Sequence, residues 1–456
     1  MSSTTEIEVS RDAALSHIGR VIPPEEHPIT TEMIDRDALY VLRKLNDAGF
    51  AGYLVGGGVR DLYLGKTPKD FDISTDAHPG QLRKLFPHSN TIGRRFRLVQ
   101  IFFRGGKTIE ISTLRSLSEY DLDGPEAVLA PNNTFGTLSE DARRRDLTIN
   151  SLFYEIENNT IIDYVNGSED LDQGIVRIVG DPAKRIGRDP VRMLRAIRHA
   201  ARIDFTIEEQ TWKALCSNSH KLSLCPPSRL RDEFLKDLYS GAAAPWFELA
   251  VDSGLLFSLF PFYRKTLTSN SAASRNLREQ LAGICRIIDR INTLSQNLKI
   301  HRQPDFFLIG LFLIPWVEAR FQLISQFRKG AVLFQLAKQI REEIDQSIGI
   351  DLNLRRSLRQ EMVSLLLNLS LLIHNKQQNG WPKWLKRKSY FKRSVLFYHL
   401  YMAAATGTSV DHLFLSEPQI QPAAEEINKV SRNSSPPKCK PAFSKKSKGG
   451  IFGFKK

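Results

Sequence analysis

The pattern of apolar and polar positions changes once along the chain. Up to about residue 170, short apolar or alternating segments predict β-strands separated by helices. The expected strands are 53–55, 71–75, 97–103 and 108–113, and the expected helices are 34–48 and 79–86. Beyond that point apolar residues recur every three or four positions, as in 189–202 and 355–373. The fold class is therefore α+β, with a mixed sheet followed by an all-α region.

A chain of 456 residues is too long for one compact core of ordinary size. From the patterns alone we expect an α/β region up to residue 170, a helical region over 171–426 and a disordered tail over 427–456. The last of these is rich in Ser, Pro, Gly and Lys, a composition that does not form a core.

The net charge of +14 is concentrated at the C-terminal end. Nine Lys and Arg and no acidic residue lie from Ile427 onward, which leaves +5 for residues 1–426. A polyanionic partner such as nucleic acid suits this balance, and so does a basic protein with no such partner.

The four cysteines lie far apart without a C-x-x-C pair, so neither a disulfide framework nor a zinc site is indicated. The N-terminus MSSTTEIEVS lacks the apolar segment of a secretory signal. The longest apolar run, Phe306 to Val317, is interrupted by Gly310 and Pro315 and is too short to cross a bilayer. We expect a soluble, cytoplasmic protein with no membrane partner.

A glycine turn follows the first predicted strand, within LVGGGVRDLYLGKTPKDFDIST at residues 54–75. Gly57 and Gly58 would let backbone N–H groups approach a phosphate closely, and Arg60 adds positive charge beside them. Many ordinary turns contain two or three glycines, so the turn alone indicates little. It becomes informative through the acidic residues that follow it.

Two aspartates, Asp70 and Asp72, stand at the start of the next predicted strand. Side chains at i and i+2 of a strand point to the same face, so the two carboxylates are expected to converge. With Glu110 from the strand TIEIST they would supply the oxygen ligands that Mg²⁺ takes, and Mn²⁺ accepts the same ligands. An isolated D-x-D pair also fits a solvated strand end. Beside a glycine turn, a two-metal site is the favoured interpretation.

The segment EDARRRDLTINSLFY, residues 140–154, places Arg145 and Asp146 before an apolar run. Arg145 can pair with triphosphate oxygens, and Asp146 can hold a ribose hydroxyl. The same residues also fit the solvated start of a helix that Asp146 caps.

A second arginine-rich segment, DPVRMLRAIRHAAR, spans residues 189–202. On a helix, Asp189 and Arg192 would share a face and could read the edge of a base, with Arg195 and Arg198 binding the nucleotide beside them. A charged helix face with internal ion pairs is the alternative.

Basic and aromatic residues alternate near the end of the helical region. The cluster consists of Lys383, Lys386, Arg387, Lys388, Lys392 and Arg393 with Trp381, Trp384, Tyr390 and Phe391. Aromatic rings can stack on bases while cations hold phosphates, which predicts RNA binding by Lys383, Lys386, Arg387 and Lys388. A solvated helix with a buried aromatic side fits the same pattern.

Together the motifs GGGVRDLYLG, DFD, RRDLTINSL and DPVRMLRAIR, in this order, resemble the class II tRNA nucleotidyltransferase and bacterial poly(A) polymerase family. The resemblance covers about residues 40–265. It implies a polymerase-β-like nucleotidyltransferase head followed by helical neck, body and tail regions. The expected bounds are 1–45 for an N-terminal lead-in and helix, 46–170 for the catalytic head, 171–265 for the neck, 266–426 for the RNA-binding body and 427–456 for the tail. It also implies metal-dependent, template-independent addition of nucleotides to RNA 3′ ends.

The resemblance assigns roles to individual residues. The family's metal ligands fall on Asp70, Asp72 and Glu110, and its sugar and triphosphate contacts on Arg145 and Asp146. The residues expected to be catalytic are Asp70, Asp72 and Asp146.

The family's base-reading pair falls on Asp189 and Arg192. One departure precedes this pair: Arg188 stands where the family usually has Glu. The departure concerns the orientation of the pair and not the chemistry of the metal site.

Two activities occur in the family: one builds CCA on tRNA, and the other extends RNA with A. The segment IGRRFRLVQIFF, residues 92–103, resembles the A-extending members through Arg94 and Arg95, although Gln100 stands where His is expected. Arg94 and Arg95 are also expected to bind RNA.

The sequence therefore predicts transfer of AMP from ATP to the 3′-hydroxyl of RNA, with mRNA and decay intermediates as acceptors and no DNA partner. A CCA-adding or A-adding tRNA nucleotidyltransferase is the first alternative. The second is a non-catalytic RNA-binding protein on the same scaffold, suggested by the basic tail and Arg188.

Overall fold

The computed structural model describes residues 19–93, 98–116, 135–377 and 380–415. Contacts within the chain gather Met1–Asp411 into one compact unit and His412–Lys456 into a second. In the second unit the described part is α21 (His412–Leu415). The basic tail expected from residue 427 lies outside the described residues, and the other expected segment bounds remain predictions.

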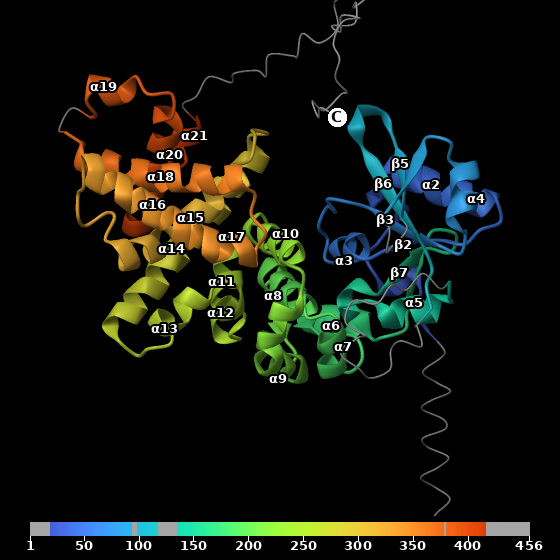
Figure 1. Ribbon diagram of the computed structural model, residues 1–456. Coiled ribbons are helices and arrows are strands. Elements are labelled where there is room, and N and C mark those ends of the chain that lie inside the picture. Colours follow the sequence, from blue (N-terminus) through green and yellow to red (C-terminus); the bar gives the residue numbers. More distant parts are fainter. Residues whose placement is uncertain (1–18, 94–97, 117–134, 378–379, 416–456) are drawn as a thin grey trace, which may run out of the picture. The chain divides into compact units, whose positions relative to one another are not determined.

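The N-terminal half of the described chain forms a mixed sheet of eight strands in the order β1-β8-β7-β2-β3-β6-β5-β4 (Figure 1). In chain order these are β1 (Arg20–Ile22), β2 (Gly52–Val55), β3 (Asp72–Thr75), β4 (Ser89–Ile92), β5 (Leu98–Phe102), β6 (Thr108–Thr113), β7 (Phe153–Glu155) and β8 (Thr160–Asp163). Among these strands β3 and β6 pair in parallel, and the other neighbours pair antiparallel.

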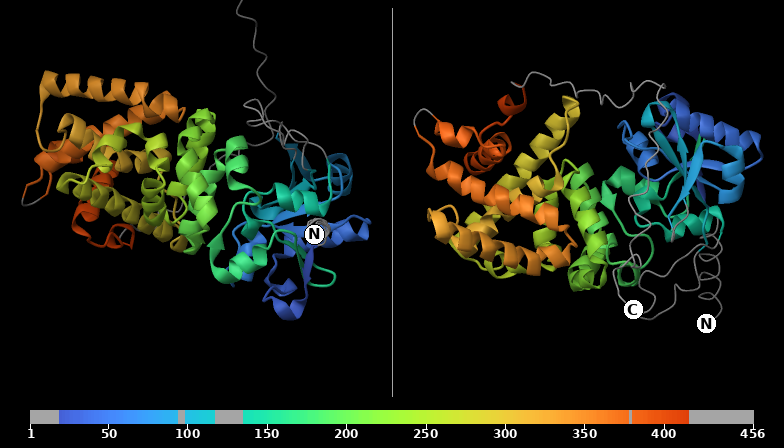
Figure 2. Two further views of the ribbon diagram at one scale, coloured as in Figure 1. Left: turned by 90° about the horizontal axis from the view of Figure 1, so that it is seen from below. Right: turned by 45° about the horizontal axis from the view of Figure 1, so that its top comes forward.

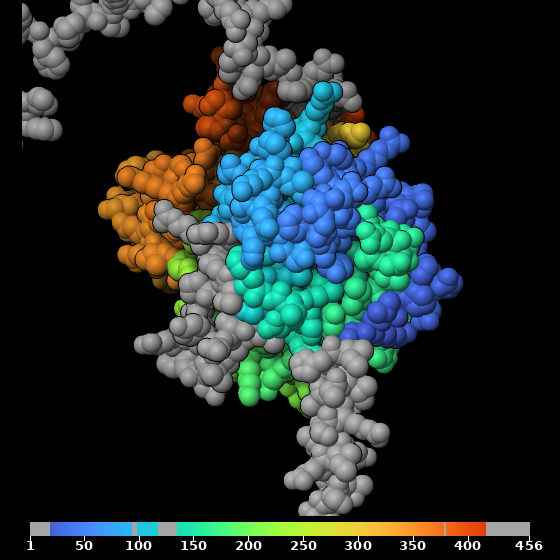
Figure 3. All heavy atoms as spheres, turned by 90° about the vertical axis from the view of Figure 1, so that its right-hand side faces the viewer, coloured from blue at the N-terminus to red at the C-terminus, as the bar shows by residue number. Residues whose placement is uncertain are grey.

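The sheet register brings distant parts of the sequence together. Asp72 at the start of β3 lies opposite Val55, the last residue of β2, and opposite Glu110 on β6. β2 also pairs with β7, so Val55 lies opposite Phe153. The last residue of β2 and the first residues of β3 and β7 therefore lie at the same level of the sheet as Glu110 within β6. On the face in Figure 3, blue residues from the start of the chain border turquoise ones from beyond residue 135.

Among the described residues, five α-helices accompany the sheet. They are α2 (Arg36–Asp47), α3 (Gly57–Tyr63), α4 (Pro79–Leu85), α5 (Leu138–Arg144) and α6 (Gly167–Gln173). Helix α2 begins after Asp35, whose carboxylate accepts hydrogen bonds from the N–H groups of Asp37 and Ala38. It buries one apolar stripe of Ala38, Val41, Leu42 and Leu45, as the periodicity of residues 34–48 predicts.

Helices dominate the rest of the described chain, apart from the two-stranded pair β9 (Ile175–Val176) and β10 (Thr206–Ile207). They are α7 (Pro182–Arg188), α8 (Arg192–Ile203), α9 (Glu209–Asn218), α10 (Pro227–Leu238), α11 (Ala243–Asp252), α12 (Leu255–Leu259), α13 (Arg264–Leu267), α14 (Ala272–Asn297), α15 (Asp305–Phe321), α16 (Gly330–Gln346), α17 (Ile348–Asp351), α18 (Arg356–His374), α19 (Lys383–Lys386) and α20 (Phe391–Thr406). The α+β class, with a mixed sheet followed by helices, is confirmed (Figure 2).

The core of the helical region is largely aromatic. Phe312 of α15 packs against the rings of Phe234, Phe247 and Phe260. The longest apolar run of the sequence, Phe306 to Val317, lies in α15, whose residues Phe307–Val317 are all buried. No helix among the described residues is both long and apolar enough to cross a membrane.

Candidate active site

The glycine turn forms where the sequence predicts it. Gly56 adopts φ of +70°, a conformation that L side chains rarely take, and α3 starts at Gly57. A Cβ atom on Gly58 would lie 3.4 Å from the carbonyl oxygen of Asp70. Glycine therefore lets the start of α3 pack closely against the segment that carries the aspartates.

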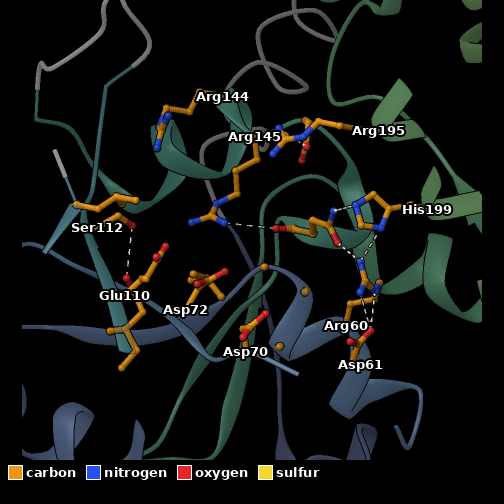
Figure 4. A pocket seen from close by; sticks show the side chains of 18 of the residues that line it. Arg60, Asp61, Asp70, Asp72, Glu110, Ser112, Arg144, Arg145, Arg195 and His199 are labelled. Atoms are coloured by element: carbon orange, nitrogen blue, oxygen red, sulfur yellow. Dashed lines mark hydrogen bonds and ion pairs between the residues drawn. The ribbon is translucent and has the colours of Figure 1, made fainter. Parts of the chain in front are cut away.

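Three carboxylates lie beside this turn (Figure 4). Asp72 is the first residue of β3 and faces its register partner Glu110 on β6. Asp70 lies before the strand, so the alternation argument that placed both aspartates on one strand face does not apply to it. Asp70, Asp72 and Glu110 nevertheless line the same cavity.

The carboxylates repel one another. Partial desolvation in the cavity, together with the charges of Glu110 and Asp70, raises the pKa of Asp72 to about 6 against the opposing effect of Arg145. Gln100 on β5 donates from Nε2 to Oε1 of Glu110 at 2.9 Å. Gln100, which departs from the expected His, thus orients the third carboxylate.

The chemistry of these donors fits a divalent cation. Hard oxygen ligands whose negative charges lie close together favour an ion that neutralises them. In the part of the chain that the structure describes, no three His, Cys, Asp or Glu side chains are already gathered as a metal cage. The assignment of Asp70, Asp72 and Glu110 as metal ligands therefore rests on their shared cavity and mutual repulsion.

Arg145 is fixed on three sides. Its Nη2 donates to Asp141 Oδ2 at 2.9 Å and to Ser74 Oγ at 3.0 Å, and its guanidinium lies 5.0 Å from the centre of the Phe153 ring. Asp141 is fully buried; burial raises its pKa, but Arg145 and Arg144 bring it below the ordinary value. Arg145 is thus held as a cation beside the carboxylates (Figure 4).

Asp146 pairs with Arg195 of α8, with 2.9 Å between Oδ2 and Nη1. Although burial raises the pKa of Asp146, Arg195, His199 and Arg192 bring it well below the ordinary value. Its other oxygen accepts a hydrogen bond from the N–H of Leu147. The carboxylate assigned to a ribose hydroxyl is therefore already engaged by a neighbouring arginine.

The expectation that Asp189 and Arg192 share one helix face is wrong. α7 ends at Arg188 and α8 begins at Arg192, so Asp189 lies between two helices and has no i,i+3 partner on one helix. Asp189 Oδ2 accepts instead from Arg229 of α10 at 2.7 Å, while Arg192 donates to the carbonyl oxygen of Arg145 at 3.1 Å. Asp189 and Arg192 still line the same cavity.

Two buried atoms of this pair are left without hydrogen-bond partners in the described structure. They are Asp189 Oδ1, an acceptor, and Arg192 Nε, a donor. Buried polar groups without partners cost free energy, so they favour a ligand that offers both a donor and an acceptor. A nucleobase edge has this character.

The assignment of Arg198 to nucleotide binding is corrected by the structure. Arg198 is 7% exposed and donates to Glu233 Oε2 at 2.5 Å and to Asp237 Oδ1 at 2.9 Å. It is not among the residues that line the cavity. Its ion pairs with Glu233 and Asp237 link α8 to α10.

Arg60 also differs from expectation. It lines the cavity, but only 2% of the residue is exposed. Its guanidinium donates hydrogen bonds to Asp61, Asn150 and His199. No role was predicted for Asn150 or His199 from the sequence. The signal for His199 is its spacing of seven from Arg192, which puts both on one face of α8.

The residues expected to bind RNA lie apart from the cavity or outside the described residues. Lys383 and Lys386 belong to α19, and Arg387 and Lys388 follow it; none of them lines the cavity. Arg94 and Arg95 lie outside the described residues.

The cavity has a volume of about 670 Å³ and an excess of cationic side chains. The cations are Arg60, Lys69, Arg115, Arg144, Arg145, Arg192, Arg195, Arg202 and Arg229, and the anions are Asp61, Asp70, Asp72, Glu110, Asp146 and Asp189. Arginines gathered beside a glycine turn suit a polyphosphate, and strand-end carboxylates suit the metal ion that accompanies it. The fold and the site together define a nucleotidyltransferase.

Comparisons with known proteins support this class. Residues 52–177 match the family model described as "Poly A polymerase head domain". Residues 204–267 match the model described as "Probable RNA and SrmB- binding site of polymerase A".

Sequence relatives name the family. Poly(A) polymerase I of Salmonella typhi is 38% identical over 323 residues, which are 69% of this chain and 68% of the relative. Poly(A) polymerase I of Haemophilus influenzae is 40% identical over 65% of this chain and 66% of the relative. The CCA-adding enzyme of Lactobacillus helveticus is 40% identical over 48% of this chain and 53% of the relative. The chain belongs to the poly(A) polymerase family within the class II nucleotidyltransferases.

Solved structures agree on the fold. A structure titled "tRNA-processing enzyme (apo form I)" covers 86% of this chain and is itself covered to 93%, with a TM-score of 0.55 at 20% identity. A CCA-adding enzyme with CTP covers 84% of this chain and is covered to 86%, with a TM-score of 0.52 at 20% identity.

Proposed function

We propose that the chain transfers AMP from ATP to the 3′-hydroxyl of RNA without a template and releases pyrophosphate. The observation that carries this proposal is the likeness to poly(A) polymerases at 38–40% identity over about two thirds of the chain. The CCA-adding relative is similar over 48% of it. The cationic cavity beside three carboxylates supports the same reaction.

In the proposed reaction the RNA 3′-oxygen attacks the α-phosphorus of ATP, the bond to the bridging α–β oxygen breaks, and pyrophosphate leaves with that oxygen. Mg²⁺, held by Asp70, Asp72 and Glu110, would stabilise the charge that develops on the attacking and leaving oxygens. Mn²⁺ satisfies the same ligands.

The chain's own residues bind and orient the nucleotide. Arg145 holds the triphosphate from a position fixed by Asp141 and Ser74. Asp146 keeps Arg195 directed into the cavity. The glycine turn at Gly57 and Gly58 provides close backbone approach to the phosphates.

Selection of adenine is assigned to Asp189 and Arg192. The free acceptor Oδ1 of Asp189 suits the 6-amino group of adenine, and Arg192 suits a ring nitrogen. Both side chains are fixed by other groups, Asp189 by Arg229 and Arg192 by the carbonyl oxygen of Arg145. A fixed pair can favour one base without a template strand.

RNA binding is assigned to the α19 cluster, defined as Lys383, Trp384, Lys386, Arg387, Lys388 and Tyr390. No Asp or Glu occurs between Glu361 and Asp411, so the cluster is not neutralised within the sequence around it. Trp384 is 50% exposed and Tyr390 is 37% exposed. Trp381 packs instead against Phe391 and donates to the carbonyl oxygen of Leu372, so its role is structural.

The deciding experiment offers ATP, CTP, GTP and UTP separately, with Mg²⁺ and a 5′-labelled unstructured RNA, and in parallel a tRNA that lacks its CCA end. A long ladder with ATP alone on the generic RNA is expected. Addition limited to C, C and A on the tRNA would assign the CCA-adding activity instead. No incorporation with either acceptor would favour the non-catalytic alternative.

A further inference from the structure

One cluster on the wall of the cavity joins three elements. The two N–H groups on Nη1 of Arg60, in α3, donate to Asn150 Oδ1 at 2.8 Å and to His199 Nδ1 at 2.9 Å. Nε and Nη2 of Arg60 donate to Asp61 Oδ1. His199 belongs to α8, and Asn150 ends the short 3₁₀ turn Thr148–Asn150. Figure 4 shows Arg60 and His199 facing each other.

The geometry fixes the proton of His199. A guanidinium only donates, so Nδ1 of His199 must accept and its proton must sit on Nε2. Burial, together with the charge of Arg60, lowers the pKa of His199 well below its ordinary value, which agrees with a neutral ring. The 3.4 Å contact between His199 Nε2 and Asn150 Nδ2 then joins two N–H groups and is not a hydrogen bond.

The hydrogen bond between Arg60 and His199 links α8 to the glycine turn. Arg192 and Arg195, on the same face of α8, attach to the carbonyl oxygen of Arg145 and to the carboxylate of Asp146. His199 attaches that face to Arg60, whose Nη2 lies 3.4 Å from the position a Cβ would take on Gly57. His199 is thus the attachment of this helix face to the phosphate side of the cavity.

We infer that His199 is a positioning residue that, by accepting from Arg60, sets the spacing between the glycine turn and the arginine face of α8. A nucleotide bound between them meets its phosphate contacts and its base contacts at that spacing. Removing the acceptor leaves a buried guanidinium N–H unsatisfied, and Arg60 then shifts to find another acceptor. The inference rests on the proposed function in using ATP as the probe.

The test compares His199→Asn, His199→Gln and His199→Phe. The amide oxygen of Asn falls near the position of Nδ1 and that of Gln near Nε2, so the Asn variant alone keeps an acceptor for Arg60. We expect His199→Asn to retain the KM for ATP, and His199→Gln and His199→Phe to raise it about tenfold, the factor that corresponds to one lost hydrogen bond to a charged group. The KM for RNA stays constant in all three. The exposed His220 provides the matched control, His220→Phe, with no change expected.

Several results overturn the inference. One is an equal KM for ATP in His199→Asn and His199→Gln. Another is a decrease in kcat alone that is proportional to the fraction of folded enzyme. If His199→Phe does not fold, the comparison of the two amide variants decides. The inference also requires that the double variant Arg60→Ala, His199→Gln have the same KM for ATP as Arg60→Ala alone. Calorimetric ATP affinity, measured with the same variants, separates this inference from the proposed function. A wild-type chain that binds ATP but extends no RNA would contradict only the latter.

Discussion

Asp72 lines the cavity within reach of solvent, beside the two carboxylates of Glu110 and Asp70. Its pKa lies at about 6 in the folded chain, against an ordinary value of 3.8, so folding favours its protonated form. The loss of folding stability caused by the ionised Asp72 carboxylate is therefore absent below about pH 4 and fully present above about pH 6. At neutral pH the folded chain holds this charge at a cost in stability.

Asp72→Asn should remove catalysis and raise the free energy of unfolding of the metal-free protein by about 1 kcal/mol at pH 8, less than the full pKa shift implies because solvent in the cavity screens the charge, with the gain vanishing near pH 4. Urea unfolding at both pH values, beside an adenylate incorporation assay, measures this. Asp47→Asn, at an exposed position at the end of α2, is the control. Substantial turnover by Asp72→Asn or Asp72→Ala would contradict the assignment of the metal site.

Arg198 offers a second test at single-residue scale. Arg198→Met leaves Glu233 and Asp237 buried without their cation, which should cost about 3–5 kcal/mol of unfolding free energy. Lys213→Met, which breaks the exposed pair with Glu209, should change it by less than about 1 kcal/mol. A raised KM for ATP in folded Arg198→Met, with no loss of stability, would return Arg198 to the nucleotide site.

At the scale of elements, periodicity predicted the helices and strands well where one buried stripe or face controls them, as in α2. It failed at Asp189, where a single helix over 189–202 was expected and two helices meet instead. The pairs Asp189–Arg229 and Arg198–Asp237 span 40 and 39 residues. Only the packing of α10 against α8 creates them, and no local pattern encodes that packing.

The contact between α10 and the α7–α8 junction controls selectivity in our proposal. Arg229→Ala should free Asp189 to rotate and lower the ratio of kcat/KM for ATP over CTP about tenfold, because one orienting charged hydrogen bond is lost. Arg231→Ala on the same helix, whose side chain pairs with Asp232, should leave the ratio unchanged. Steady-state kinetics with both nucleotides decides; an unchanged ratio in Arg229→Ala would show that Asp189 needs no partner.

The α19 cluster should affect RNA and leave ATP unaffected. Trp384→Ala should weaken binding of single-stranded RNA about tenfold, since one stacked base is lost, while the KM for ATP stays constant. Phe334→Ala on α16, an aromatic residue that is 70% exposed, is the matched control. Fluorescence anisotropy with labelled RNA measures both variants. If Trp384→Ala binds RNA as tightly as the unmodified chain, the cluster is an ordinary solvated surface.

At the scale of the whole molecule, the cavity draws its lining from Val55 to Arg229. Binding of ATP with Mg²⁺ should therefore slow amide hydrogen exchange in two separate stretches, the glycine turn at 56–63 and the α7–α10 segment at 182–238. Mass spectrometry of exchanged peptides reports both. Protection limited to the first stretch would argue against base contacts from α8.

The motifs predicted which residues line this cavity better than they predicted the hydrogen-bond partners that orient those residues. Asp70, Asp72, Glu110, Arg145, Asp146, Asp189, Arg192 and Arg195 all line it, as the family resemblance implies. The identities follow from chemistry that short motifs carry. Their hydrogen-bond partners depend on the packing of helices that lie far along the chain, and burial decides which arginines remain accessible.

The strand order has a consequence for synthesis. A ribosome-bound chain that ends at Thr113 already contains all three carboxylates, yet the edge of β2 that β7 later covers is still open. The arginines that complete the cavity have not been translated at that stage. A chain that terminates at this point therefore exposes an unpaired strand edge, which favours aggregation or chaperone binding, and it lacks the arginines of the cavity that follow Thr113.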